Sequence, residues 1–189
     1  MHPVEHRGLR ELYAMARRLR EHWRTLAGRL DASAPEQAQL LRDGSQVARR
    51  LIGELTAVGA ARGIYGRPTA QGLGARLAGV QNAMIDPSLE VNQALRIALL
   101  DVVHVVTLLD FLARAAAQDA DPELEAFLGG WAGELRAHEA TVRAAAVALG
   151  DDPDGAARPC TPGLGGRIAH GAAIALGSFG EWMDRRAAR

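Results

Sequence analysis

Two short stretches, Asp31-Ala32-Ser33-Ala34-Pro35 and Asp119-Ala120-Asp121-Pro122, decide how this chain folds. Each of them separates two long segments in which apolar residues recur every three or four positions, the period of a helix buried along one face. Proline suits the first turn of a helix, and a serine or aspartate just before it can cap the free N–H groups. Each stretch therefore predicts a tight turn between two antiparallel helices.

Four long helices follow from these two turns. We expect them from Gly8 to Leu30, from Ser33 to Gly59, from Asp86 to Gln118 and from Asp121 to Gly150. In the second helix, Ser33 and Glu36 have the spacing of a capping box. The first helix carries a regular apolar seam, which consists of Leu9, Leu12, Ala16, Leu19, Trp23, Leu26 and Leu30.

The connection between the two hairpins is much longer than the turns within them. About 27 residues, from Ala60 to Asp86, separate the hairpins, and they are predicted to include a short helix near 73–84. A four-helix bundle with one long central connection has the ferritin-like arrangement. The prediction is an all-α, ferritin-like four-helix bundle over residues 1–150. Residues 151–189 are predicted to form a linker and an extra C-terminal helix.

Composition excludes several classes of protein. Hydrophobic residues make up 48% and the net charge is zero, as in an ordinary globular domain. All 22 basic residues are arginine, so chemistry that needs a lysine is excluded. A single cysteine, Cys160, excludes an internal disulfide and thiolate zinc clusters. With no secretory signal and no apolar run of roughly 18 residues, we expect a cytoplasmic protein.

Charge is distributed unevenly along the chain. Residues 1–76 contain 13 arginines and 7 acids, whereas residues 77–157 contain 4 arginines and 13 acids. A basic first hairpin beside an acidic second hairpin predicts attraction, either within the bundle or between subunits. The arginines of residues 17–24 are accompanied by Glu11 and Glu21, and no recognition motif follows, so we expect no nucleic-acid partner.

Candidate metal ligands lie on or near the apolar faces of three helices. Asp101 falls in the apolar arc of the third helix, and His104 lies beside that arc. On the fourth helix, His138 lies within the apolar stripe and Glu134 near its edge. Glu54 stands at the boundary of the apolar face of the second helix. The spacing of Asp101 and His104 is one that metal-binding bundles use.

These five residues have two interpretations, because a buried acid is costly unless it is paired. They can form a buried polar cluster that fixes helix register, or they can bind iron, manganese or zinc. A di-iron site uses about four carboxylates and two histidines from four helices. The seam of the first helix has no carboxylate, and His2, His6 and His22 are expected at the surface. We therefore expect the polar cluster without a cofactor, with metal binding as the alternative.

Several short motifs resemble one bacterial family. Leu12-Tyr13, Val102-Val103-His104 and Glu134 resemble motifs in the first, third and fourth helices of ferritin-like stress proteins of the YciE/YciF kind. The resemblance covers about residues 8–150 and implies a ferritin-like fold with a stress-related role. Ala16, Val103 and Val106 stand where that family has glutamates. The resemblance therefore implies a divergent member that lacks most of the metal ligands.

The leading functional hypothesis is a non-enzymatic bundle that acts as a structural or interaction module, and the alternative is a mono- or di-metal protein.

The C-terminal helix, about Leu164 to Ala187, has one bulky and one small-residue face, so it needs two contacts. We predict a homodimer that buries Ala169, Ala173, Gly177 and Phe179. Contact of this helix with a membrane surface is a weaker alternative, because few arginines flank it.

Overall fold

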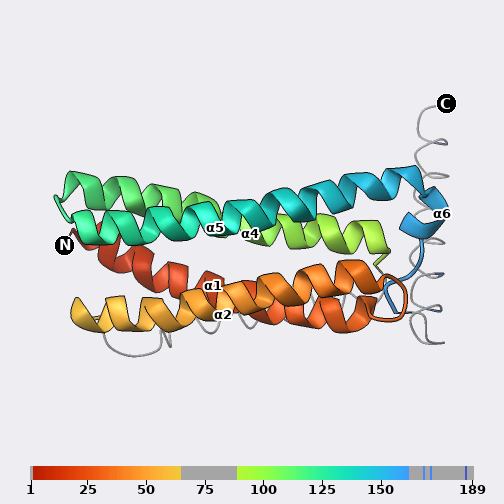
Figure 1. The fold of residues 1–189 in the computed structure, drawn as a ribbon, viewed down its shortest axis with the longest axis horizontal. Helices are drawn as coiled ribbons and strands as arrows, with labels where there is room; N and C mark the ends of the chain where they lie inside the picture. The colour runs from red at the N-terminus through yellow and green to blue at the C-terminus, as the bar shows by residue number, and fades with distance from the viewer. Residues whose placement is uncertain (1, 65–88, 162–167, 169–170, 172–185, 187–189) are drawn as a thin grey trace.

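The computed structural model of the chain describes residues 2–64, 89–161, 168, 171 and 186, and the long helices among them form an antiparallel bundle (Figure 1). Helix α1 spans Pro3–Leu30, α2 spans Pro35–Ala61, α4 spans Val91–Gln118 and α5 spans Pro122–Ala148. A 3-10 turn, η2 (Leu149–Asp151), and the short helix α6 (Pro153–Ala156) follow. Within the described residues the only β-type pairing is an isolated bridge between Glu90 and Pro159. The all-α prediction is confirmed.

The two tight turns join neighbouring antiparallel helices, as predicted. Helix α1 packs along α2 and α4 along α5, and the hairpins meet with α1 beside α4 and α2 beside α5. Gly8, near the start of α1, lies against Leu112, near the end of α4. Arg62, just after α2, pairs with Asp121, just before α5. Each long helix therefore runs antiparallel to both of its neighbours.

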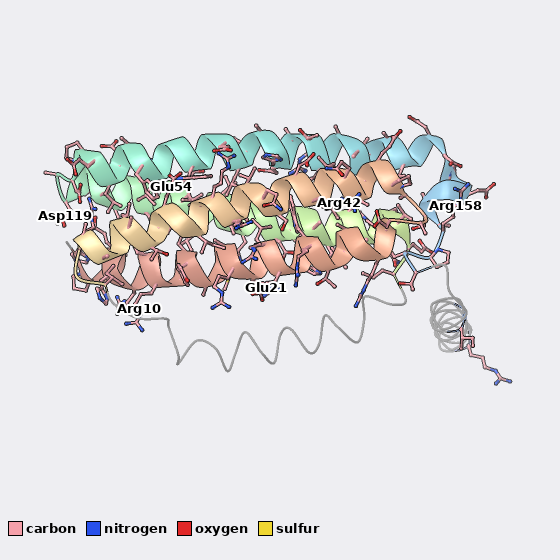
Figure 2. The ribbon with its side chains drawn as sticks, turned by 60° about the horizontal axis from the view of Figure 1, so that its bottom comes forward. Arg10, Glu21, Arg42, Glu54, Asp119 and Arg158 are labelled. Atoms are coloured by element: carbon pink, nitrogen blue, oxygen red, sulfur yellow. The ribbon has the colours of Figure 1, made fainter. Side chains whose placement is uncertain are left out.

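The end of α2 and the start of α4 lie at opposite ends of the bundle (Figure 1). Asp119 and Arg158 mark these two ends (Figure 2). Residues 65–88 therefore connect one end of the bundle to the other, which agrees with the long central connection predicted from the sequence. The short helix predicted near 73–84 lies outside the described residues.

The core is built from the apolar stripes that the sequence shows. All seven residues of the predicted α1 seam are buried, with at most 5% of their surface exposed. The stripes of α2 and α5 are buried as well, through Leu41, Ala48, Leu51, Leu55, Leu124, Leu128, Trp131, Leu135 and Val142. Complete burial of a leucine-sized side chain stabilises the fold by roughly 1.5–3 kcal/mol. These stripes therefore hold the four helices together.

Two helix starts differ from the predictions. Helix α1 begins at Pro3 rather than at Gly8, because His2 caps it. The Val4 N–H donates to His2 Nδ1 at 3.2 Å, and the His2 N–H donates to Glu5 Oε2 at 2.6 Å. Helix α4 begins at Val91 rather than at Asp86, because Glu90 is its N-cap and forms the capping box with Gln93.

The capping box predicted for Ser33 and Glu36 is wrong. The N-cap of α2 is Ala34, and no side chain caps this helix. The Ser33 hydroxyl lies one residue too early and instead donates to the carbonyl of Cys160 at 3.2 Å. The N-cap predicted for α5 is confirmed, because the Leu124 N–H donates to Asp121 Oδ1 at 3.0 Å.

The segment that follows α5 is tied back onto the bundle. The Val91 N–H donates to the carbonyl of Arg158, and the Cys160 N–H donates to that of Leu89, both at 2.9 Å. Cys160 is fully buried beneath these contacts. The predicted interface residues Ala169, Ala173, Gly177 and Phe179 lie outside the described residues. In the described part of the chain, no helix has the length and apolar character needed to cross a membrane.

Candidate functional site

A buried ionisable pair joins the first hairpin to the second. His22 on α1 places Nδ1 at 2.5 Å from Oδ2 of Asp101 on α4. Their side chains are only 7% and 11% exposed. Arg18, one turn earlier on α1, places its guanidinium 3.8 Å from Oδ1 of the same carboxylate. Arg18, His22 and Asp101 together are called the hairpin-interface cluster below.

The residue next to His22 fixes the position of this cluster. The indole N–H of Trp23 donates to the carbonyl of Ala98, one turn before Asp101 on α4, at 3.1 Å. The other side of the same helix lies against α2, where the Ser45 hydroxyl donates to the carbonyl of Arg20 at 3.0 Å. His22 and Trp23, which follow one another on α1, each bind α4, and together they set the rotation and the height of α4 relative to the first hairpin.

The prediction that His22 is a surface residue is wrong, since only 8% of it is exposed. A signal for its burial was present in the sequence. His22 lies three residues after Leu19 and four before Leu26, which places it at the edge of the α1 seam. Its partner Asp101 is 79 residues away, and only helix packing brings the two together.

Glu54 and Glu134 belong to a different contact, between α2 and α5. The indole N–H of Trp131 donates to Glu54 Oε2 at 2.9 Å, and Figure 2 shows Glu54 on α2 beside the second hairpin. Arg50 forms an ion pair with Glu134, and its guanidinium lies 5.7 Å from the centre of the Trp131 ring. Half-buried His138 lies one turn after Glu134, whereas His104 is exposed. The residues of the predicted cluster are thus separated, because Asp101 lies between α1 and α4, whereas Glu54 and Glu134 lie between α2 and α5.

The ion pairs between the hairpins share one polarity. In Arg18–Asp101, Arg50–Glu134 and Arg62–Asp121, the arginine comes from the first hairpin and the acid from the second. The backbone N–H of Leu124 and then the guanidinium of Arg62 lower the pKa of Asp121. The attraction predicted from the uneven charge distribution therefore acts inside the bundle.

The hairpin-interface cluster supplies one imidazole and one carboxylate, and that carboxylate also faces Arg18. Within the ranges that the structure describes, no group of three histidine, cysteine, aspartate or glutamate residues is placed to hold a metal ion. Burial raises the pKa of the Cys160 thiol to about 11. Because the thiolate is the reactive and metal-binding form, this cysteine is inert at neutral pH.

Comparison of the chain with known protein families, with curated proteins and with solved structures finds no match. The resemblance to the YciE/YciF kind of stress protein therefore remains a prediction that rests on the quoted residues alone. Proposals about function start from the contacts between the hairpins.

Proposed function

We propose that this chain is a non-enzymatic helical bundle of ferritin-like connectivity that acts as a structural or interaction module. The observation that carries the proposal is how its candidate ligands are used. Asp101 and Glu134 each face an arginine of the opposite hairpin, and Glu54 accepts the indole N–H of Trp131. If Asp101 bound a metal instead, it would give up its contacts with Arg18 and His22. Because the side chains of His22 and Asp101 are only 7% and 11% exposed, breaking that pair is costly.

A role in stress response enters this proposal only through the resemblance of residues 8–150 to the YciE/YciF kind of protein. The hairpin contacts support the module itself, because they stabilise one fixed arrangement of four helices. Such a bundle offers long, rigid outer faces on which a partner can pack.

Metal binding is the second candidate function, and the hairpin-interface cluster is what favours it. His22 and Asp101 bring an imidazole and a carboxylate together between two helices, and their direct hydrogen bond of 2.5 Å would have to open to admit an ion. Imidazole and carboxylate are common ligands of zinc and of iron. A single metal ion held there would need further ligands from solvent or from other parts of the chain.

Metal analysis of the full-length protein separates the two candidates. The purified chain is incubated in turn with Fe²⁺, Mn²⁺ and Zn²⁺, dialysed, and measured by elemental analysis. If the chain is a structural or interaction module, the bound metal should be far less than one ion per chain for the wild type and for every variant. One ion per chain that is lost in His22→Ala and Asp101→Asn, but kept in the control Asp110→Asn, would overturn it.

A further inference from the structure

Exposed and half-exposed arginines form two straight stripes on the first hairpin. Residues seven apart lie on the same side of a helix, because two turns take about 7.2 residues. One stripe is on α1 and the other on α2, and they consist of Arg10, Arg17 and Arg24, and of Arg42 and Arg49. Figure 2 labels one arginine of each stripe, Arg10 on α1 and Arg42 on α2. Successive arginines of a stripe are about 10.5 Å apart along the helix.

A contact between α1 and α2 sets the two stripes side by side. The Ser45 hydroxyl donates to the carbonyl of Arg20 at 3.0 Å, so these two residues are level on the antiparallel helices. The tight turn between α1 and α2 gives the same register. Arg17 lies three residues before Arg20, and Arg49 lies four residues after Ser45. Arg17 and Arg49 are therefore level to within one residue, and the next pair along the two stripes is level as well.

Most acids of the first hairpin lie on its other sides. Glu11 is seven residues before Arg18, whose ion-pair partner is on α4, so Glu11 lies on the side of α1 that is turned to α4. Asp43 is seven residues before Arg50, whose partner is on α5. Asp43, and Glu36 seven residues earlier, therefore lie on the side of α2 that is turned to α5. The helix faces separate charges that are mixed along the sequence.

Two acids lie beside the arginine stripes, and each of them pairs with one arginine. Glu21 pairs with Arg17 at 3.4 Å, and Asp31 pairs with Arg42 at 2.8 Å. In the described part of the chain the other arginines of this surface have no ion-pair partner, and they are Arg10, Arg20, Arg24 and Arg49. We call this surface the arginine face, and it consists of Arg10, Arg17, Arg20, Arg24, Arg42 and Arg49. Six arginines against two acids leave an excess of four positive charges on it.

We propose that the arginine face binds the phosphate backbone of a nucleic acid. A guanidinium presents a planar fork of N–H donors that matches phosphate oxygens, and four of these groups have no acid to satisfy them within the bundle. A nucleic-acid strand offers one phosphate roughly every 3.4 Å, so arginines about 10.5 Å apart can each reach one. This inference rests on the proposed function, since it names the partner of the interaction module.

The fold removes the reason for which the sequence led us to expect no nucleic-acid partner. That expectation rested on Glu11 and Glu21, which accompany the arginines of residues 17–24. In the structure Glu11 lies on the side of α1 turned to α4, and Glu21 pairs with Arg17 alone. Arg20 and Arg24 have no acid beside them in the described part of the chain.

The character of the arginine face favours a nucleic acid over a protein or a membrane. The large exposed hydrophobic side chains of the described residues are Leu100, Phe111, Val147 and Ile168, and none of them is on α1 or α2. Protein interfaces have an apolar core that is depleted of charged residues, and a helix lying on a membrane buries an apolar face. Interfaces with nucleic acids are more polar and much more positively charged.

Fluorescence anisotropy of the full-length protein with a labelled DNA duplex of roughly 20 base pairs tests the proposal. EDTA is present throughout to remove metal ions. Binding through phosphates alone gives a dissociation constant of about 10⁻⁶–10⁻⁴ M at physiological salt. Each neutralised phosphate contributes about −0.9 to the slope of log K against log salt, so the four arginines without acid partners predict a slope of about −3.6.

The double variant Arg24→Gln with Arg49→Gln removes half of those four arginines. It should weaken binding at least about tenfold at about 0.1 M salt and make the slope shallower by about 2. The matched control is Arg96→Gln with Arg114→Gln, which removes the same charge from two exposed positions on α4. It should change the dissociation constant by less than about twofold. Circular dichroism confirms that both double variants fold.

Three results would overturn the arginine face as a phosphate site. The wild type might show no binding at about 100 μM protein and low salt, although phosphate contacts predict tighter binding. The control might weaken binding as much as the variant of the arginine face does. Polyglutamate or vesicles containing phosphatidylserine might bind as tightly as the duplex, which would assign the face to an acidic protein or a membrane. A metal-free chain that ignores the duplex removes only this inference, whereas stoichiometric metal with the expected DNA binding removes only the proposed function.

Discussion

Gly44 of α2 lies flat against the indole ring of Trp23 of α1. A Cβ atom added at Gly44 would come within 2.0 Å of the ring, and Trp23 is completely buried. The same indole donates to the carbonyl of Ala98 on α4, so this one side chain of α1 contacts both α2 and α4. The missing side chain at Gly44 is what allows α1 and α2 to approach each other around it.

Gly44→Ala should therefore destabilise the bundle, although alanine is the better helix former. Overpacking a core of this kind typically costs about 1–3 kcal/mol, and urea unfolding followed by circular dichroism measures that cost. Gly53→Ala is the matched control on the same helix, because a Cβ there meets nothing within 4 Å. It should stabilise the protein by about 0.5–1 kcal/mol. Equal effects of the two substitutions would contradict the close contact with Trp23.

Asp101→Ala should be the most damaging of the charge deletions between helices. It leaves His22 and Arg18 without the carboxylate that they share, and breaking a buried pair costs about 3 kcal/mol. Asp110→Ala removes an acid whose side chain is 46% exposed, so it should cost less than about 1 kcal/mol. Both values come from chemical denaturation of the full-length protein.

A double-mutant cycle with His22→Ala then assigns the cost to the pair. If His22 and Asp101 interact as the 2.5 Å contact indicates, the double variant is less destabilised than the sum of the two single variants. Strict additivity would mean that the two side chains stabilise the bundle independently.

The thiol of Cys160 should make the bundle less stable in alkali. Burial raises its pKa from 9.0 to about 11, so the unfolded chain loses this proton at a lower pH than the folded chain. The stabilising contribution is therefore complete below about pH 9 and is lost as the pH rises from about 9 to about 11. Unfolding free energies measured across this range should fall more steeply for the wild type than for Cys160→Ala. Parallel curves would show that the thiol is not buried.

The helices and their pairing into hairpins can be predicted from the sequence, because the signals for them are local. The apolar seam of α1 and the cap at Asp121 depend on residues within one or two turns of each other. The polarity of the hairpin contacts also follows from counting charges along the chain. Cap positions are less predictable, as Ser33 shows, because its hydroxyl binds a carbonyl 127 residues away.

The candidate site was only partly predictable. The periodicity of α4 correctly marked Asp101 as a buried acid in need of a partner. It placed His104 beside the apolar arc, yet His104 is exposed, because the buried arc of α4 faces α1 and α5. His22 was missed because a histidine at the edge of a seam is compatible with either burial or exposure.

By itself the sequence determined four amphipathic helices, two hairpins with tight turns and a basic half that attracts an acidic half. Only the tertiary structure decided which side chains meet. Each residue along a helix turns the side chain by about 100° and advances it by 1.5 Å. Whether Asp101 meets His22, or Trp23 meets Gly44, therefore depends on the rotation and height of whole helices. Those are set by packing all four stripes at once, and no local pattern contains that information.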